Sequence, residues 1–354
     1  MVNVTEAMAA KIEETESYRR LTKEGYTPLA VVNGLHRLGR SDDDVCLYHQ
    51  NDGCDLHREL GADEKPIICR SYPFQVVEME EAYFVSLAYS CPAVLAGVGG
   101  PIHEFKADLA PFLTEDAKTV LKAPTDDDGY PLTTEHSISW TDYLRLEKQL
   151  IRVDPADPVL FFLNVSCCII GQLVSDGRLD VEELDFRRPH DLLGDAVDTF
   201  PIFAIACLSI IERELDFEER EIFAEALKNG VNPPSTLLNA PCPDFQILRA
   251  DSQVIRDMLQ RYISNLITGK RLLLGPTLIS RLLMLSVSLA LLLYYHRFQA
   301  DLKGTRHFDF DQWEWAFETI ELNLVTHSSD LLPYFQQFEK TLIAIARVHE
   351  GTPA

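Results

Sequence analysis

The chain has 354 residues, and its 55 Asp and Glu against 32 Lys and Arg give a formal net charge of −23. A hydrophobic fraction of 46% with 25% charged residues is typical of globular proteins, which excludes a disordered or fibrous chain. The acidity argues against a large nucleic-acid or anionic-membrane interface, because both need clustered Lys and Arg. We therefore expect no nucleic-acid partner.

The first segment predicts an amphipathic helix over residues 6–23, with Thr5 as its N-cap and Gly25 just past its end. Residues 1–20 are polar and acidic and hold no apolar segment of the kind that a secretory signal needs. We therefore expect a cytoplasmic protein. Structural disulfides are rare in the cytoplasm, so the eight cysteines of the chain need another explanation.

Half of the cysteines lie in one stretch of the chain among polar and turn-forming residues: Cys46, Cys54, Cys69 and Cys91. The turn signal at residues 51–53 is expected to fold Cys46 and Cys54 back towards each other. The β-like runs 74–77 and 83–89 predict a hairpin, whose closure would return Cys91 to the neighbourhood of Cys69. Four thiols that converge are what a soft metal or an iron–sulfur cluster requires.

The spacing of these cysteines does not by itself establish a metal site. Cys-x7-Cys-x14-Cys-x21-Cys lacks the Cys-x2-Cys pairs of common zinc fingers, so spacing leaves metal ligands and unrelated thiols both open. His49 and His57 are either surface residues or substitute ligands. Lys65 and Arg70 are expected to lower thiol pKa values and to offset the negative charge of a thiolate site.

The same region resembles the YkgJ-type cysteine-cluster family over roughly residues 2–115, and its most specific part is the element Cys69-Arg-Ser-Tyr-Pro-Phe74. Further matching segments are Cys46-Leu-Tyr, Gly53-Cys54-Asp-Leu-His57, Lys65-Pro66 and Ser90-Cys91-Pro92. That family is described as zinc- or iron-chelating and is related to flagellin lysine-N-methylase, for which an iron–sulfur cluster is implied. The resemblance implies a metal at Cys46, Cys54, Cys69 and Cys91, supported by Lys65, Arg70 and Tyr72. The cofactor that it implies is an iron–sulfur cluster of the 4Fe–4S type, or zinc.

One part of the family pattern is missing. Family members carry an upstream cysteine group just before a segment that Val2-Asn-Val-Thr5-Glu resembles. Either the natural chain starts further upstream and carries this group, which is the alternative that we expect, or this member has lost it. The remaining four thiols would then form only part of the site, or one of two sites.

Beyond about residue 110 the pattern is almost entirely helical. Apolar residues from Val254 to Ile267 recur at helical spacing between Ser252 and Gly269, and further helices are expected over 277–297, 311–325 and 331–348. The apolar run 282–295 is short for a membrane span and predicts a buried core helix. Cys167, Cys168 and Cys207 lie in apolar runs and are expected in the core, whereas Cys242 and the acidic runs 42–44 and 126–128 are expected in loops.

The sequence thus predicts a mainly α protein, with a small cysteine-rich module containing a β-hairpin at 1–115 and an α-helical bundle at 116–354. Its predicted function is a metal-binding protein with a four-cysteine site and a helical domain for a protein substrate or partner. One alternative is a protein-lysine N-methylase that uses S-adenosylmethionine, although no methyl-donor motif is recognisable. A second is an interaction protein with incidental thiols. The oligomeric state stays open.

Overall fold

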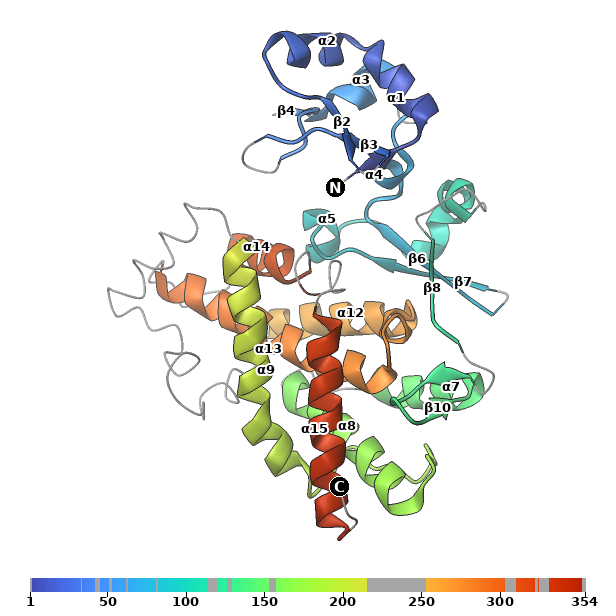
Figure 1. Ribbon diagram of the computed structural model, residues 1–354, viewed down its shortest axis with the longest axis vertical. Helices are drawn as coiled ribbons and strands as arrows, with labels where there is room; N and C mark the ends of the chain where they lie inside the picture. Colours follow the sequence, from blue (N-terminus) through green and yellow to red (C-terminus); the bar gives the residue numbers. More distant parts are fainter. Residues whose placement is uncertain are drawn as a thin grey trace. The chain divides into compact units, whose positions relative to one another are not determined.

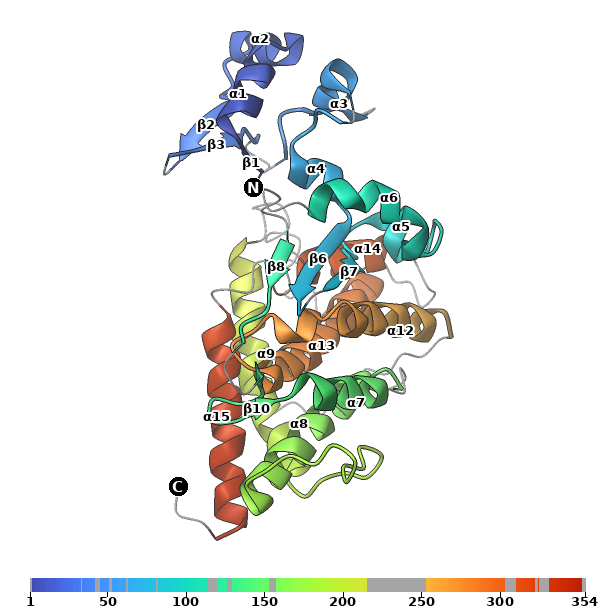
Figure 2. The same cartoon turned by 90° about the vertical axis from the view of Figure 1, so that its right-hand side faces the viewer.

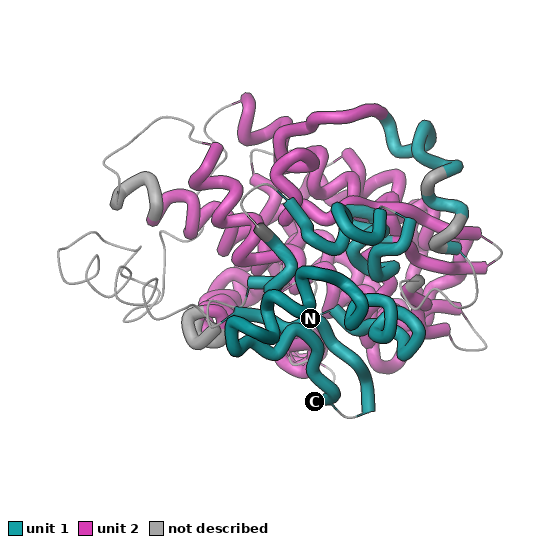
Figure 3. Tube along the Cα trace, turned by 90° about the horizontal axis from the view of Figure 1, so that it is seen from above, with its two compact units in different colours: residues 1–75, 101–120 teal, residues 76–100, 121–354 magenta. Residues whose placement is uncertain are grey.

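The computed structural model describes residues 2–32, 34–41, 45–50, 53–61, 63–80, 82–113, 120–125, 129–152, 157–214, 253–302, 310–321, 324 and 331–351. The chain divides into two compact units, each formed by two stretches of sequence (Figure 3). Unit 1 comprises residues 1–75 and 101–120, and unit 2 comprises residues 76–100 and 121–354. The described fold is mostly helical with a few small sheets, as predicted. The domain boundary at 115/116 stays a prediction.

Unit 1 combines short strands with short helices. An antiparallel sheet has the order β1-β3-β2, formed by β1 (Asn3–Val4), β3 (Leu35–Leu38) and β2 (Leu29–Val32). The helices are α1 (Glu6–Glu13), α2 (Glu16–Lys23), α3 (Asp55–Leu60), α4 (Ile67–Ser71) and α6 (Lys106–Leu109). The core of the unit is a small apolar cluster that includes Ile12, Leu21 and Leu38.

The single helix predicted over residues 6–23 is wrong, because the chain forms two helices that meet at Thr15. Thr5 is the N-cap of α1, as predicted, and accepts the Met8 backbone N–H at 3.2 Å. Thr15 adopts an extended conformation, accepts the Tyr18 N–H at 3.2 Å and donates to the Ile12 carbonyl at 2.6 Å. Thr15 therefore ends the first helix and caps the second, since a capping hydroxyl supplies the partner that helix-terminal groups lack.

The predicted hairpin, most of which belongs to unit 2, is formed by β6 (Phe74–Met79) and β7 (Ala82–Leu87) in a sheet of order β7-β6-β8, with β8 at Val120–Lys122. The amide side chain of Asn265, from α12 (Gln253–Thr268), donates to the Leu87 carbonyl and accepts the Leu87 N–H, both at 2.8 Å. These two bonds satisfy the open edge of β7 and fix it to α12. A Cβ atom added at Gly269 would lie 2.5 Å from the Ser86 Cβ, which is closer than such atoms pack.

The helical body of unit 2 is built around α13 (Leu278–Leu302). Its neighbours are α8 (Pro158–Asp176), α9 (Leu193–Glu214), α14 (Phe310–Ile320) and α15 (Leu332–His349), which run past it in Figures 1 and 2. α13 is mainly apolar with no single apolar face, which is typical of a helix that is covered all round, and its buried polar residues include Arg281. The body also contains α7 (Trp140–Leu150) and the short paired strands β9 (Tyr130–Pro131) and β10 (Ser137–Ile138).

Most of the predicted helices and core positions of unit 2 are confirmed. The apolar face predicted for α12 is buried except for Val254, whose side chain is 55% exposed. Cys167, Cys168 and Cys207 are buried in the core, as predicted. Several predictions lie outside the described residues: the Asn51–Asp52 turn, the helix start at Ser252, Cys242 and the acidic runs 42–44 and 126–128.

Within the part of the chain that the structure describes, two helices are long and apolar enough to span a bilayer by length and composition alone, at Pro158–Asp176 and Leu278–Phe298. The fold buries 67% of the most apolar stretch of the first helix and 100% of that of the second. Core helices of globular proteins share these properties. The prediction that 282–295 lies in a buried core helix agrees with this burial, and the cytoplasmic location stays a prediction.

Candidate functional site

Two of the predicted ligands are placed by a tight reversal of the chain in unit 1. Strand β4 (His49–Gln50) pairs antiparallel with β5 (Gly53–Cys54), so that His49 lies opposite Cys54. Cys46 forms an antiparallel bridge with Arg40, and its carbonyl accepts the His49 N–H at 2.8 Å. The chain therefore folds back between Cys46 and Cys54, as the sequence predicts.

Helix α3, which starts directly after Cys54, is held by charged groups. Asp55 is buried and forms ion pairs with Arg20 of α2, at 2.7 Å, and with Arg58. Glu59 accepts the backbone N–H groups of Glu16, at 2.6 Å, and Ser17, at 3.0 Å, at the N-terminus of α2. A carboxylate there satisfies unpaired amides and complements the helix dipole. These bonds fix the position of Cys54 against α2.

The third thiol, Cys69, comes from α4, whose first turn follows Pro66. The Cys69 N–H donates to the Pro66 carbonyl at 2.9 Å, which closes that turn. Cys46, Cys54 and Cys69 are all half-buried and all pack against the apolar core of unit 1. The fold thus packs three thiols from different structural elements against a common core.

The three thiols also interact with one another electrostatically. Burial raises the pKa of the Cys46 thiol, and the nearby Cys54 adds to this rise. Burial raises the pKa of Cys69 to about 11, with further contributions from Cys46 and Cys54 and an opposing one from Lys65. Without a cation, Cys46 and Cys69 are therefore protonated at neutral pH, because each negative charge would be desolvated and would repel the others.

The predicted supporting residues lie close by but take different roles. Lys65 lowers the pKa of Cys69, as expected from its charge. The Arg70 guanidinium instead donates to the Asp63 carbonyl, and the Tyr72 side chain is exposed. Arg40 lowers the pKa of Cys46 and was missed by the sequence analysis, since only the bridge between strands brings it to the thiol.

Cys91 belongs to unit 2, where it is the residue before α5 (Pro92–Leu95). Its carbonyl accepts the Leu95 N–H at 3.0 Å and its own N–H donates to the Ala88 carbonyl at 3.2 Å. The preceding residue, Ser90, donates its backbone N–H to the buried carboxylate of Glu321. Cys91 thus has a defined backbone position within its unit, and its meeting with Cys69 stays a prediction.

A cavity of about 570 Å³ in unit 1 is lined by the chain neighbours of Cys69, Ile68 and Arg70. It is lined by both ends of the Lys65–Arg70 segment, by β1 and by the start of β3 around His36. This volume falls within the range of small-molecule sites. The Lys65 and Arg70 side chains that were predicted to support the thiols therefore also face a space that a ligand can occupy.

The donor set of unit 1 suits a soft cation in its chemistry, because three thiols with two cationic neighbours favour thiolate formation once a metal is near. The positions of the donors do not yet match a coordination shell. Among the described residues, no group of three His, Cys, Asp or Glu side chains is arranged to hold a metal ion. No protein-family model, no curated protein and no solved structure matches the chain.

Proposed function

We propose that the protein binds a thiolate-preferring metal centre, an iron–sulfur cluster or zinc, through Cys46, Cys54 and Cys69, with Cys91 as the fourth ligand. The observation that carries the proposal is the electrostatic coupling of three half-buried thiols from separate segments. The resemblance of the surrounding motifs to the YkgJ-type family supports the same four residues.

Metal binding would change the state of these thiols. Coordination requires thiolates, so binding a metal releases protons from groups whose pKa burial has raised. Lys65 and Arg40 would offset part of the resulting negative charge. The metal would also draw the sulfur atoms together, and its binding free energy would add to the stability of unit 1, whose apolar core is small.

The test is anaerobic purification of the full chain from cells supplied with iron and zinc, followed by metal analysis and an absorption spectrum. Iron with sulfide and a broad visible band would identify a cluster, and zinc without colour would identify a thiolate zinc site. We expect Cys69→Ala to remove most of the metal. Cys207→Ala, which alters a buried core thiol of unit 2, is the matched control and should retain it.

A folded wild-type chain without metal would contradict the proposal and favour the interaction protein with incidental thiols. Cys91→Ala tests the fourth ligand separately. If Cys69→Ala removes the metal and Cys91→Ala does not, the centre is confined to unit 1. The lysine N-methylase alternative, with S-adenosylmethionine as donor, stays a prediction from the resemblance alone.

A further inference from the structure

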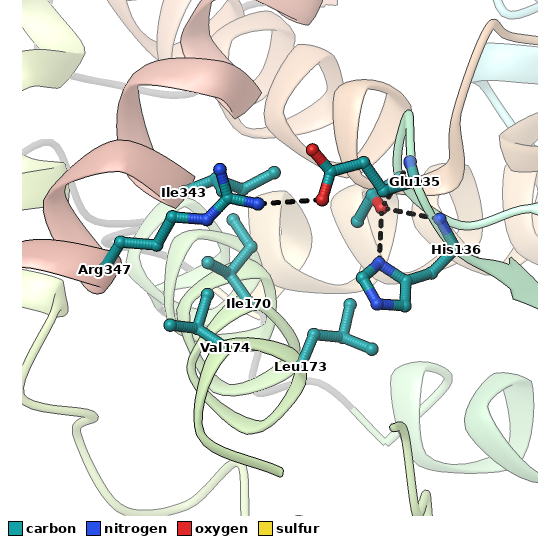
Figure 4. A pocket seen from close by; sticks show the side chains of 8 residues that line it. Glu135, His136, Ile170, Leu173, Val174, Ile343 and Arg347 are labelled. Atoms are coloured by element: carbon teal, nitrogen blue, oxygen red, sulfur yellow. Dashed lines mark hydrogen bonds and ion pairs between the residues drawn. The ribbon is translucent and has the colours of Figure 1, made fainter. Parts of the chain in front are cut away.

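Unit 2 contains a pocket of about 240 Å³ where α8, α15 and the turn between β9 and β10 meet (Figure 4). The side chains of one wall are aliphatic: Ile170, Leu173 and Val174 of α8, and Ile343 of α15. Ile170 is fully buried, and Val174 and Ile343 are half-buried. The pocket therefore offers a branched apolar surface that remains reachable from outside.

Two opposite charges face each other over this surface. Arg347 of α15 and Glu135 of the turn form an ion pair of 2.8 Å, which joins them in Figure 4. Their side chains are 35% and 54% exposed. An ion pair in contact with water contributes little net free energy. A ligand that carries both charges can consequently replace it, bonding to Arg347 with its anion and to Glu135 with its cation.

His136 supplies a further donor, whose tautomer follows from its neighbour. Thr133 Oγ1 accepts the backbone N–H groups of Glu135 and His136, at 3.2 and 3.1 Å. Both of its acceptor positions are then used, so its hydroxyl proton goes to His136 Nδ1, which lies 3.2 Å away. With Nδ1 as acceptor, the neutral imidazole carries its proton on Nε2, which is left to donate to a ligand.

We propose that this pocket binds an α-amino acid with a branched aliphatic side chain. The carboxylate bonds to Arg347 and to His136 Nε2–H, the ammonium bonds to Glu135, and the side chain packs on Ile170, Leu173, Val174 and Ile343. The Arg347 guanidinium can form two parallel bonds with a carboxylate, the geometry that this side chain favours.

The volume agrees with this class of ligand. Since a cavity of about 150 Å³ holds a benzene ring, one of about 240 Å³ holds about nine or ten non-hydrogen atoms, the size of leucine or isoleucine. An apolar carboxylic acid of similar size would leave Glu135 without a cation, and an apolar amine would leave Arg347 without an anion. The paired charges therefore favour the zwitterion over both.

The experiment is a calorimetric titration of the full chain with L-leucine, and with isocaproate and isoamylamine, which lack its ammonium and its carboxylate. We expect leucine to bind saturably and each analogue to bind at least about tenfold more weakly, as expected for the loss of a charge-assisted hydrogen bond. Arg347→Ala removes the group that binds the carboxylate, and Ile343→Phe fills the pocket. Each substitution should also weaken leucine binding by at least about tenfold.

Arg145→Ala is the matched control. It removes an exposed arginine of α7 that pairs with Asp142 at 2.8 Å, away from the pocket, and should leave leucine binding unchanged. The proposal is overturned if leucine gives no saturable heat with the wild-type chain, if Arg347→Ala and Ile343→Phe bind it normally, or if isocaproate binds as tightly. Circular dichroism of each variant confirms that the helices are retained.

Discussion

Glu321 is a buried carboxylate that faces a cation and two tyrosine hydroxyls in unit 2. It accepts the Ser90 backbone N–H and interacts with the buried guanidinium of Arg271. Tyr262 of α12 and Tyr89, which follows β7, also face it. Burial is the main cause that raises the pKa of Glu321 to about 7, against the lowering effects of Ser90 and Arg271. The residue therefore changes charge near neutral pH.

This raised pKa makes the stability of unit 2 depend on pH. The folded state holds the Glu321 proton more tightly than the unfolded state, so the stabilisation is complete below about pH 4.5 and is lost as the pH rises through about 7. The loss amounts to about 3 kcal/mol. We expect Glu321→Gln to remove this part of the pH dependence in urea unfolding followed by tryptophan fluorescence. Glu314→Gln, in α14 before Glu321, should leave the dependence in place, and an identical slope in both variants would contradict the assignment.

At the scale of elements, a single side chain fixes the edge of a sheet to a helix. Asn265 satisfies both backbone groups of Leu87 in β7. Asn265→Ala leaves these partly buried groups without protein partners, so we expect a loss of about 2 kcal/mol in the free energy of unfolding. Hydrogen exchange at the Leu87 amide and the urea midpoint measure the two consequences. Thr268→Ala, also on α12, is the control. Equal effects of the two substitutions on the free energy of unfolding would contradict a stabilising role for the bonds to β7.

At the scale of the whole molecule, the two units have separate apolar cores. All three tryptophans, Trp140, Trp313 and Trp315, belong to unit 2, so their fluorescence reports on that unit alone. Ile12→Ala opens a cavity in the core of unit 1 and should cost that unit about 2–5 kcal/mol. We expect faster proteolysis of unit 1 with no shift in the tryptophan transition. Phe335→Ala in unit 2 should shift the tryptophan transition, and a shift with Ile12→Ala would show that the units unfold together.

The larger helices could be predicted from the sequence because their burial is periodic. The apolar spacing of α12 and the terminator Gly269 define a face that the fold covers. The prediction that Val254 is buried is wrong, because periodicity does not say how far the buried face extends at the start of the helix. The division at Thr15 was missed because a mid-sequence threonine is also tolerated inside a helix, and Glu59, which stabilises the new N-terminus, lies far away in sequence.

The candidate sites also contain some features that local sequence predicts and others that depend on the folded chain. The chain reversal that brings Cys46 and Cys54 together follows from local turn residues, so it was predictable. The roles of Arg40 and Arg70 depend on which backbone groups each one meets in the folded unit, and their charge alone does not reveal them. The pocket around Arg347 and Glu135 draws its walls from three separate segments of the chain, and its ion pair joins residues 212 positions apart. No local pattern can predict such a site.

The burial of α13 also has a consequence for biosynthesis. The helix covers Leu278–Leu302, and among the described helices that pack on it, α8 and α9 leave the ribosome before it. This long apolar segment therefore emerges when two of the described helices that cover it have already been made. Its remaining sides are covered only after α14 and α15 have been made, which takes a few seconds at a synthesis rate of about 5–20 residues per second. The order of the helices thus shortens the time during which this segment is exposed to chaperones and to membranes.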